Sequence, residues 1–224
     1  MDEPMSGGVE RKSPWRQAAL GGLQRVVPKH RLFVRGSEKS RSVYLTFDDG
    51  PDPVRTTQVL DVLQKYSVQA TFFVVGQQAA AHRNLLRRVA EMGHAIGGHT
   101  YYHHRPEQVN ARQLMSEIHE TDAVLRETLG ITSPWFRPPF GKLTVGKLWR
   151  LWADRRTIVL WNRDPRDYRA STAREVIDWV QQNPISGGDV LLFHDTAPHT
   201  AAALDEIVPY LRKAGLDFAA LGEN

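Results

Sequence analysis

Two adjacent carboxylates, Asp48 and Asp49, stand between an apolar run and a Gly-Pro turn in the stretch YLTFDDGPDP, residues 44–53. Because two neighbouring negative charges repel each other, the pair is either an acidic turn open to water or a pair that shares a positive partner. Asp, Gly and Pro are all turn formers, which supports the first interpretation. The second requires a cation near the carboxylates, and the rest of the chain must supply its other ligands.

Two histidines supply candidate ligands, because His99 and His103 in HTYYHH are four residues apart. On a helical turn this spacing would put both imidazoles on one face, whereas the bland alternative is a pair of surface or capping histidines. Two imidazoles and one carboxylate form a common catalytic metal set with a position open for water. One aspartate would then bind the metal, and its neighbour would stay off it as a general base, held ionised by the cation.

Further polar residues have both a chemical and a structural interpretation. His194 in LLFHD could protonate a leaving group, or it could be a structural histidine at a strand end. Arg137 in WFRPPFG could orient the base carboxylate by charge-assisted hydrogen bonds, or lie on the surface beside the Pro-Pro pair. Asp164 and Asp167 in WNRDPRDY are either solvated turn residues, or one of them holds an imidazole in its useful tautomer.

The elements that must position these residues alternate along the chain from Ser42 onward. We expect strands at 42–47, 70–76, 94–100, 134–140, 157–162, 189–195 and 216–221, and helices at 56–66, 84–92, 111–129, 145–155, 172–182 and 200–214. Strands separated by helices predict a parallel α/β fold, either a barrel or an open sheet. The candidate residues lie at or just beyond strand ends, and such ends meet at one rim of the sheet.

Composition bounds the remaining possibilities. The 224 residues suit a single domain, in which residues 1–40 form a basic N-terminal tail or lead-in and residues 41–224 form the folded domain. The absence of cysteine excludes disulfides and thiolate metal sites. Formal charge is only +4, and basic residues do not interleave regularly with aromatic ones, so we expect no nucleic-acid partner.

Membrane and export signals are not found in the sequence. No stretch approaches the ~18 apolar residues of a transmembrane span. The N-terminal stretch AALGGLQRVV is interrupted by Gln24 and Arg25, so it does not form a signal-peptide core. The chain as written is therefore expected to be cytoplasmic, or extracytoplasmic if an export signal has been lost. The oligomeric state is not specified by any sequence feature.

Five ordered motifs carry a family resemblance. TFDDGP, HTYYH, RPPFG, DPRDY and LLFHD resemble the motifs of the polysaccharide deacetylases with a NodB-homology domain, carbohydrate esterase family 4. The resemblance runs from about Val43 to the C-terminal region. It implies a single-domain distorted (β/α) barrel of about seven or eight strands. It also implies hydrolysis of the N-acetyl group of an N-acetylglucosamine-containing glycan, such as chitin oligosaccharide, peptidoglycan or exopolysaccharide.

Carried over motif by motif, the resemblance assigns catalytic roles to four residues. Asp48 would be the general base and Arg137 the residue that orients it. His194 would be the general acid, tuned by Asp167.

The same resemblance implies the cofactor and the substrate contacts. The ligands of a divalent metal, foremost Zn²⁺ with Co²⁺, Mn²⁺ or Ni²⁺ as alternatives, would be Asp49, His99 and His103. The backbone N–H of Phe140 would help to hold the oxyanion, and Leu192 would line the acetyl-methyl pocket. This chain has Tyr168 where the family usually has Trp, and Phe140 where it often has Tyr. The first change alters the pocket wall and bears on the choice of acyl group and substrate.

Four alternative functions compete with N-deacetylation. An aspartyl-phosphate phosphatase is suggested by the likeness of TFDDG to a DxDG motif, but no residue separates the two aspartates and the histidines would have no role. A non-catalytic glycan-binding module is disfavoured because every implied catalytic side chain is present. Within the family, an O-acetyl esterase or a non-sugar amide hydrolase is the nearer alternative. The motifs do not distinguish among glycan substrates or among the candidate metals.

Overall fold

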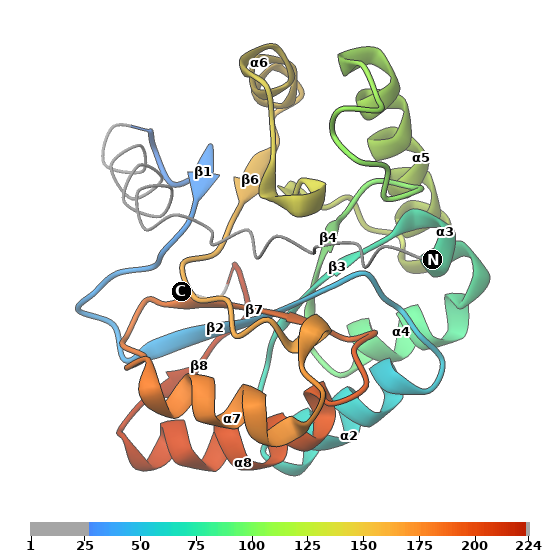
Figure 1. Ribbon diagram of the computed structural model, residues 1–224. Coiled ribbons are helices and arrows are strands. Elements are labelled where there is room, and N and C mark those ends of the chain that lie inside the picture. The colour runs from blue at the N-terminus through green and yellow to red at the C-terminus, as the bar shows by residue number, and fades with distance from the viewer. Residues whose placement is uncertain (1–26, 223–224) are drawn as a thin grey trace, which may run out of the picture.

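The protein forms one curled parallel sheet wrapped by helices (Figure 1). The structure is a computed structural model in which residues 27–222 are described. The strands are β1 (Leu32–Phe33), β2 (Ser42–Asp48), β3 (Thr71–Val74), β4 (Ala95–Gly98), β5 (Trp135–Phe136), β6 (Thr157–Val159), β7 (Val190–His194) and β8 (Asp217–Phe218). They follow the order β1-β6-β5-β4-β3-β2-β7, with β8 paired to β2. The expected α/β barrel is therefore confirmed as a half-barrel whose path ends at β1 and β7.

Helices connect successive strands of this sheet. They are α2 (Arg55–Lys65), α3 (Gly76–Ala81), α4 (Arg83–Glu91), α5 (Ala111–Leu129), α6 (Val145–Ala153), α7 (Ala173–Gln182) and α8 (Thr200–Lys213), with 3-10 turns η1 (Pro139–Gly141) and η2 (Asp167–Arg169). The bounds of α5 match the prediction because Asn110 and Gln113 form a capping box and Gly130 closes the helix at φ 71°. Helix α3 was not predicted, since six residues are too few to show helical periodicity. Among the described helices, none is long and apolar enough to cross a membrane.

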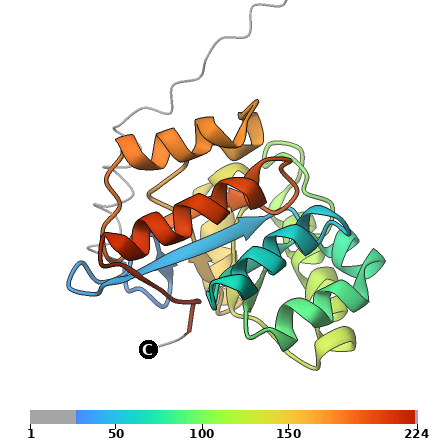
Figure 2. The same cartoon turned by 90° about the horizontal axis from the view of Figure 1, so that it is seen from below.

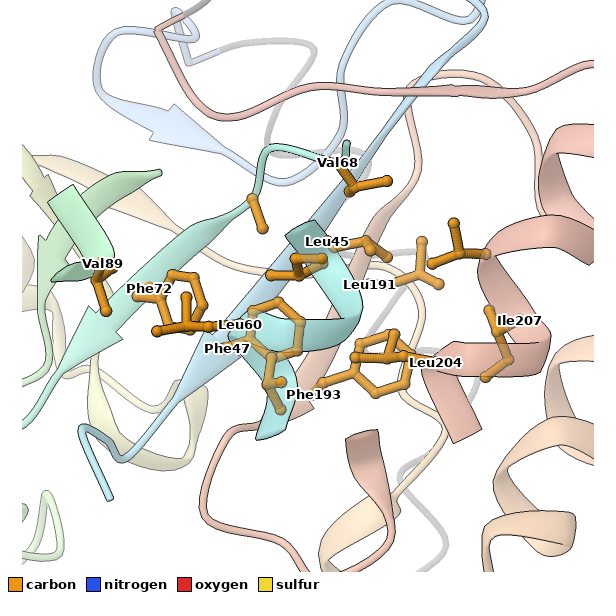
Figure 3. Packing of buried hydrophobic residues seen from close by; sticks show 14 of the residues in the cluster. Leu45, Phe47, Leu60, Val68, Phe72, Val89, Leu191, Phe193, Leu204 and Ile207 are labelled. Atoms are coloured by element: carbon orange, nitrogen blue, oxygen red, sulfur yellow. The ribbon is translucent and has the colours of Figure 1, made fainter. Parts of the chain in front are cut away.

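Side chains alternate along β2 between the hydrophobic core and the inner face of the half-barrel, where the candidate site lies. Val43, Leu45 and Phe47 are buried in a hydrophobic cluster between the sheet and the helices. Figure 3 shows Leu45 and Phe47 packed among side chains of α2, β7 and α8, and Figure 2 shows α7 (orange) beside α8 (red). Because successive strand residues face opposite sides, Thr46 and Asp48 lie on the inner face of the half-barrel. The apolar half of β2 anchors the strand, and the polar half is available for chemistry.

The folded domain begins earlier than the sequence predicted. Strand β1 lies within the expected lead-in of residues 1–40, and Leu32 pairs in register with Ile158 of β6. Leu32 and Val34 are buried in a second cluster with residues of α5, α6 and β6. A domain boundary at residue 41 is therefore too late. The sequence did not predict β1, because a two-residue strand is too short to show alternation. Residues 1–26 of that segment lie outside the described residues.

Candidate active site

The aspartate pair lies at the end of the central strand β2. Asp48 is the last residue of β2 and is in register with His194 at the end of β7. Asp49 has a left-handed backbone with φ 81°, which breaks the alternation of the strand. The turn thus allows two consecutive carboxylates to reach the same rim, and the bend is at Asp49 itself as well as at the Gly-Pro dipeptide that follows.

Arg137 lies inside the half-barrel and fixes Asp48. Its side chain is fully buried, and Nη1 donates to Asp48 Oδ1 at 2.7 Å and to Thr46 Oγ1 at 2.8 Å. The guanidinium lies 4.1 Å from the centre of the Phe73 ring, and it also donates to the backbone carbonyls of β6 and the residue beyond it. Burial lowers the pKa of Arg137 and the charge of Asp48 opposes that shift, and an arginine remains a cation in proteins. The alternative that Arg137 is a surface residue is excluded.

Asp49, His99 and His103 come together as a possible metal site. One ligand atom from each lies within 4.8 Å of the others. Asp49 Oδ1 is 3.5 Å from His99 Nε2 and 3.3 Å from His103 Nε2. This oxygen is buried, and within the described part of the chain no hydrogen bond reaches it. An orphaned carboxylate oxygen that faces two imidazole nitrogens fits a divalent cation.

The two histidines are prepared to act as neutral ligands. His99 Nδ1 is 2.7 Å from the backbone carbonyl of Arg137, so Nδ1 carries the proton and Nε2 presents its lone pair. Burial lowers the pKa of His103, and the proximity of His99 lowers it further. Metal binding requires the unprotonated imidazole, which the surroundings of His103 favour.

A loop, and not a helical turn, brings His99 and His103 together. They follow β4 in a segment without regular structure, and the backbone is left-handed at Thr100, φ 62°, and at His103, φ 57°. The expectation that a helical turn aligns the two imidazoles is therefore wrong, although both reach the site. Spacing alone does not reveal two such residues, because β-carbon-bearing residues rarely adopt positive φ.

The neighbouring helices hold this histidine loop in place. The N–H groups of the first two residues of α3 donate to the carbonyls of Thr100 and Tyr101 at 2.9 and 3.0 Å. Glu117 of α5 accepts from the Tyr102 N–H at 3.2 Å and lies 2.7 Å from His104 Nδ1. The sequence does not mark Glu117 as a functional residue, since a single carboxylate in an amphipathic helix has the same pattern as a solvent-exposed one.

His194 and Asp167 form a second pair at the same rim. His194 Nδ1 is 2.8 Å from Asp167 Oδ1, and Asp167 Oδ2 accepts from the His194 N–H and the Thr200 hydroxyl. Burial acts to lower the pKa of His194, but the hydrogen bond and charge of Asp167 outweigh it, and the charges of the β2 aspartates add to that effect, raising the pKa to about 9. Asp167, and not Asp164, therefore holds the imidazole.

The three residues implied in substrate binding surround these groups. Phe140 lies in η1 with a left-handed backbone, and its ring centre is 5.1 Å from that of His103. The ring centre of Tyr168 is 4.9 Å from that of His194, in an edge-on arrangement. Both aromatic side chains are partly exposed, at 39% and 43%. Leu192 is buried two residues before His194, on the same face of β7. The structure thus brings all ten predicted site residues to one rim.

Asp195 is a buried carboxylate at this rim for which sequence analysis proposed no function. It directly follows His194 and accepts hydrogen bonds from the Gly50 N–H at 2.9 Å and from the Thr56 hydroxyl at 2.6 Å. Burial raises the pKa of Asp195, the charge of Asp49 adds to the shift, and these two donors oppose it, so that the pKa is about 7. Its position at a strand end was visible in the sequence, but its partners were not.

A carboxylate–imidazole metal set, a braced carboxylate and a paired imidazole at the rim of a parallel half-barrel define a metal-assisted hydrolase. The comparisons agree with that class, since residues 35–151 match the polysaccharide deacetylase family. The peptidoglycan-N-acetylglucosamine deacetylase of Bacillus cereus is 34% identical over 200 residues, covering 87% of this chain and 72% of that protein. The chitooligosaccharide deacetylase of Sinorhizobium fredii is 32% identical over 208 residues, covering 87% and 96%.

A solved structure shows the same architecture. The crystal structure of a peptidoglycan N-acetylglucosamine deacetylase in complex with a substituted benzamide matches with a TM-score of 0.82 and 33% identity. The match covers 85% of this chain and 91% of that chain. The protein described here therefore belongs to the polysaccharide deacetylase family.

The buried Arg137–Asp48 pair makes a stability prediction. Arg137→Met should lower the free energy of unfolding by about 3–5 kcal/mol, because it leaves the Asp48 carboxylate buried without its cation. Adding Asp48→Asn should recover part of the loss by removing the uncompensated charge. Urea denaturation of the two variants and the wild type measures both changes. A loss below ~1 kcal/mol for Arg137→Met would show that the pair does not carry this energy.

Metal binding makes a separate prediction. Calorimetric titration of metal-free protein with Zn²⁺ should show one site per chain, which Asp49→Ala or His103→Ala abolishes by removing a ligand atom. His119→Ala is the matched control, because this exposed histidine contacts Asp154 on the outer surface. Equal Zn²⁺ affinity in the Asp49→Ala variant and the control would contradict the assigned ligands.

Proposed function

We propose that the protein is a metal-dependent N-deacetylase that removes the acetyl group from N-acetylglucosamine units of a poly- or oligosaccharide. One observation carries this proposal: a carboxylate fixed by a buried arginine and an imidazole fixed by a buried aspartate lie at the ends of two adjacent strands, beside the metal set. Hydrolysis of an amide needs a base and an acid in this relation, because water must lose a proton and the departing amine must gain one.

Asp48 supplies the base. Its Oδ1 is engaged by Arg137, which leaves Oδ2, 3.7 Å from His99 Nε2, directed toward the metal ligands. This oxygen takes the proton of the water that attacks the acetyl carbonyl carbon. Arg137 prevents rotation of the carboxylate, so that the free oxygen keeps its aim.

His194 supplies the acid. Because Asp167 holds Nδ1, Nε2 is the nitrogen left to donate a proton to the amine as the C–N bond breaks. The raised pKa keeps the imidazole protonated at neutral pH, before the amine departs. A leaving amine is a poor leaving group unless it is protonated, so the reaction requires this proton.

The remaining groups bind the acetyl group and the cation. The Phe140 N–H contributes a hydrogen bond to the developing oxyanion, and Leu192 packs against the acetyl methyl group. Asp49, His99 and His103 would hold a divalent ion, which lowers the pKa of water and stabilises negative charge on the carbonyl oxygen. Zinc is the metal proposed, because two imidazoles and one carboxylate are a ligand set of catalytic zinc sites.

Substrate and metal are tested together by following acetate release. Metal-free protein restored with Zn²⁺ should release acetate from acetylated chito-oligosaccharides and from peptidoglycan, whereas Asp48→Asn should fall by about 10²–10⁴-fold through loss of the base. Chelation should abolish the activity and zinc restore it, with Co²⁺, Mn²⁺ and Ni²⁺ compared in parallel. Acetate released from acetylated xylan alone would replace the N-acetyl assignment by an O-acetyl esterase. Wild-type activity equal to that of Asp48→Asn would defeat the proposal.

The pKa of His194 sets a pH dependence. Its acid form is lost as the pH rises through the pKa, so kcat/KM should fall on the alkaline side. In Asp167→Asn the hydrogen bond and charge that raise the pKa are removed, and the alkaline limb should move to lower pH, toward the ordinary value of 6.5. Thr200→Val, which removes one donor to Asp167 but no charge, should move the limb much less. An alkaline limb unchanged in Asp167→Asn would exclude His194 as the titrating acid.

A further inference from the structure

One buried carboxylate at the rim has no part in the chemistry above. Asp195 is 1% exposed and directly follows His194. Among the described residues, its side chain makes no hydrogen bond to the candidate metal ligands. Both of its oxygens are used inside the protein: Oδ1 by the Gly50 N–H at 2.9 Å and Oδ2 by the Thr56 hydroxyl at 2.6 Å.

These two partners stand at opposite ends of one turn. Gly50 is the residue after Asp49, and Thr56 lies in the first turn of α2. The Thr56 hydroxyl also accepts from the Asp52 N–H at 2.7 Å, so the carboxylate reaches the middle of the turn through it. The carbonyl of Gly50 accepts from the N–H of Val75, the residue just after β3, at 3.0 Å. The peptide groups of Gly50 are thus held from β7 on one side and from β3 on the other.

The glycine itself is explained by Asp195. A Cβ atom at Gly50 would lie 1.9 Å from Asp195 Oδ2 and 2.5 Å from its Cγ, whereas real Cβ contacts essentially never fall below 3.0 Å. Gly50 is not among the described glycines with positive φ, so its backbone does not need glycine for conformational reasons. What excludes a side chain there is the close approach of the carboxylate.

The turn has a conformation that needs such support. Asp49 is held at φ 81°, a left-handed backbone that costs energy for a residue with a β-carbon. Its neighbour Gly50 is the point at which the turn is tied to β7. We propose that Asp195 is a positioning residue for the metal site: it fixes the turn after Asp49 against the end of β7, so that Asp49 Oδ1 stays beside His99 and His103. This inference rests on the metal ligands assigned above and does not depend on the identity of the glycan.

The proposal predicts weaker metal binding when Asp195 is changed. Asn at position 195 keeps the size but has a single carbonyl acceptor and no charge, so it cannot serve both donors equally. In Asp195→Asn the Kd for Zn²⁺, measured by calorimetry on metal-free protein, should rise about 10–100-fold. With zinc bound, kcat should fall while KM for the glycan stays within about twofold, because the substrate contacts are intact. Asp205→Asn is the matched control, since that exposed carboxylate pairs with Lys65 and should leave both quantities unchanged.

A conservative pair separates positioning from general loss of stability. Thr56→Val removes the hydroxyl that links Asp195 to the turn, and should also weaken Zn²⁺ binding. Thr56→Ser keeps the hydroxyl and should restore the affinity, even where both variants lower the melting temperature. This pair leaves the buried carboxylate in place, so it tests the proposal if Asp195 variants do not fold.

The Gly50 contact provides a double-mutant test. As a single substitution, Gly50→Ala should weaken Zn²⁺ binding, because the new methyl group displaces the Asp195 carboxylate. In the Asp195→Ala background the methyl group has room, so Gly50→Ala should add little further loss, and the two effects should be clearly non-additive.

The outcomes are separable from those of the proposed function. The positioning role would be overturned if Asp195→Asn and Thr56→Val lowered the melting temperature but kept the Kd for Zn²⁺ of the wild type. Additive effects of Gly50→Ala and Asp195→Ala on the Kd would also overturn it. If the wild type released no acetate from any glycan, the proposed function would fail. The zinc titrations would still decide the role of Asp195.

Discussion

The site depends on the guanidinium of Arg137, which is buried within the half-barrel. Arg137 uses its side chain to fix the Asp48 carboxylate, its carbonyl to accept from His99 Nδ1, and its N–H to donate to the carbonyl of Gly98 in β4. The candidate base and one candidate metal ligand are therefore oriented by the same residue. A buried guanidinium must be paired and hydrogen-bonded to be tolerated, so the surrounding strands are constrained to present acceptors to it.

Strand ends provide the second constraint. Strand β2 ends on Asp48 and β7 on His194, and the two residues lie in register on neighbouring parallel strands. In each case the next residue leaves the strand: Asp49 turns toward the metal set, and Asp195 turns back to the β2 turn. Two dipeptides at neighbouring strand ends thus supply the proposed base, acid, metal ligand and brace. Parallel pairing places them together without any long loop.

The sequence predicted those features that depend on local pattern. The strand at 42–47, the helix at 111–129 and the polar residues at strand ends were predicted, because each follows from a short sequence period or from the ends of such periods. The conformation of the histidine loop was not, since its left-handed residues and its contacts with Glu117 are made across the fold. The same holds for Asp195 and for β1, whose partners lie far away along the chain. The residue types of the site were accessible from sequence, and the structure was needed for the groups that hold them.

The backbone at Asp49 has a consequence for the descent of such proteins. Asparagine tolerates a left-handed φ about as well as aspartate does, and it has nearly the same shape. A single change from Asp to Asn at this position would keep the turn and the fold, yet replace the proposed anionic ligand by a neutral one. Catalysis could then disappear from a lineage without any visible mark on the architecture. For relatives of this chain, inheritance of the half-barrel and inheritance of the reaction are therefore separate events.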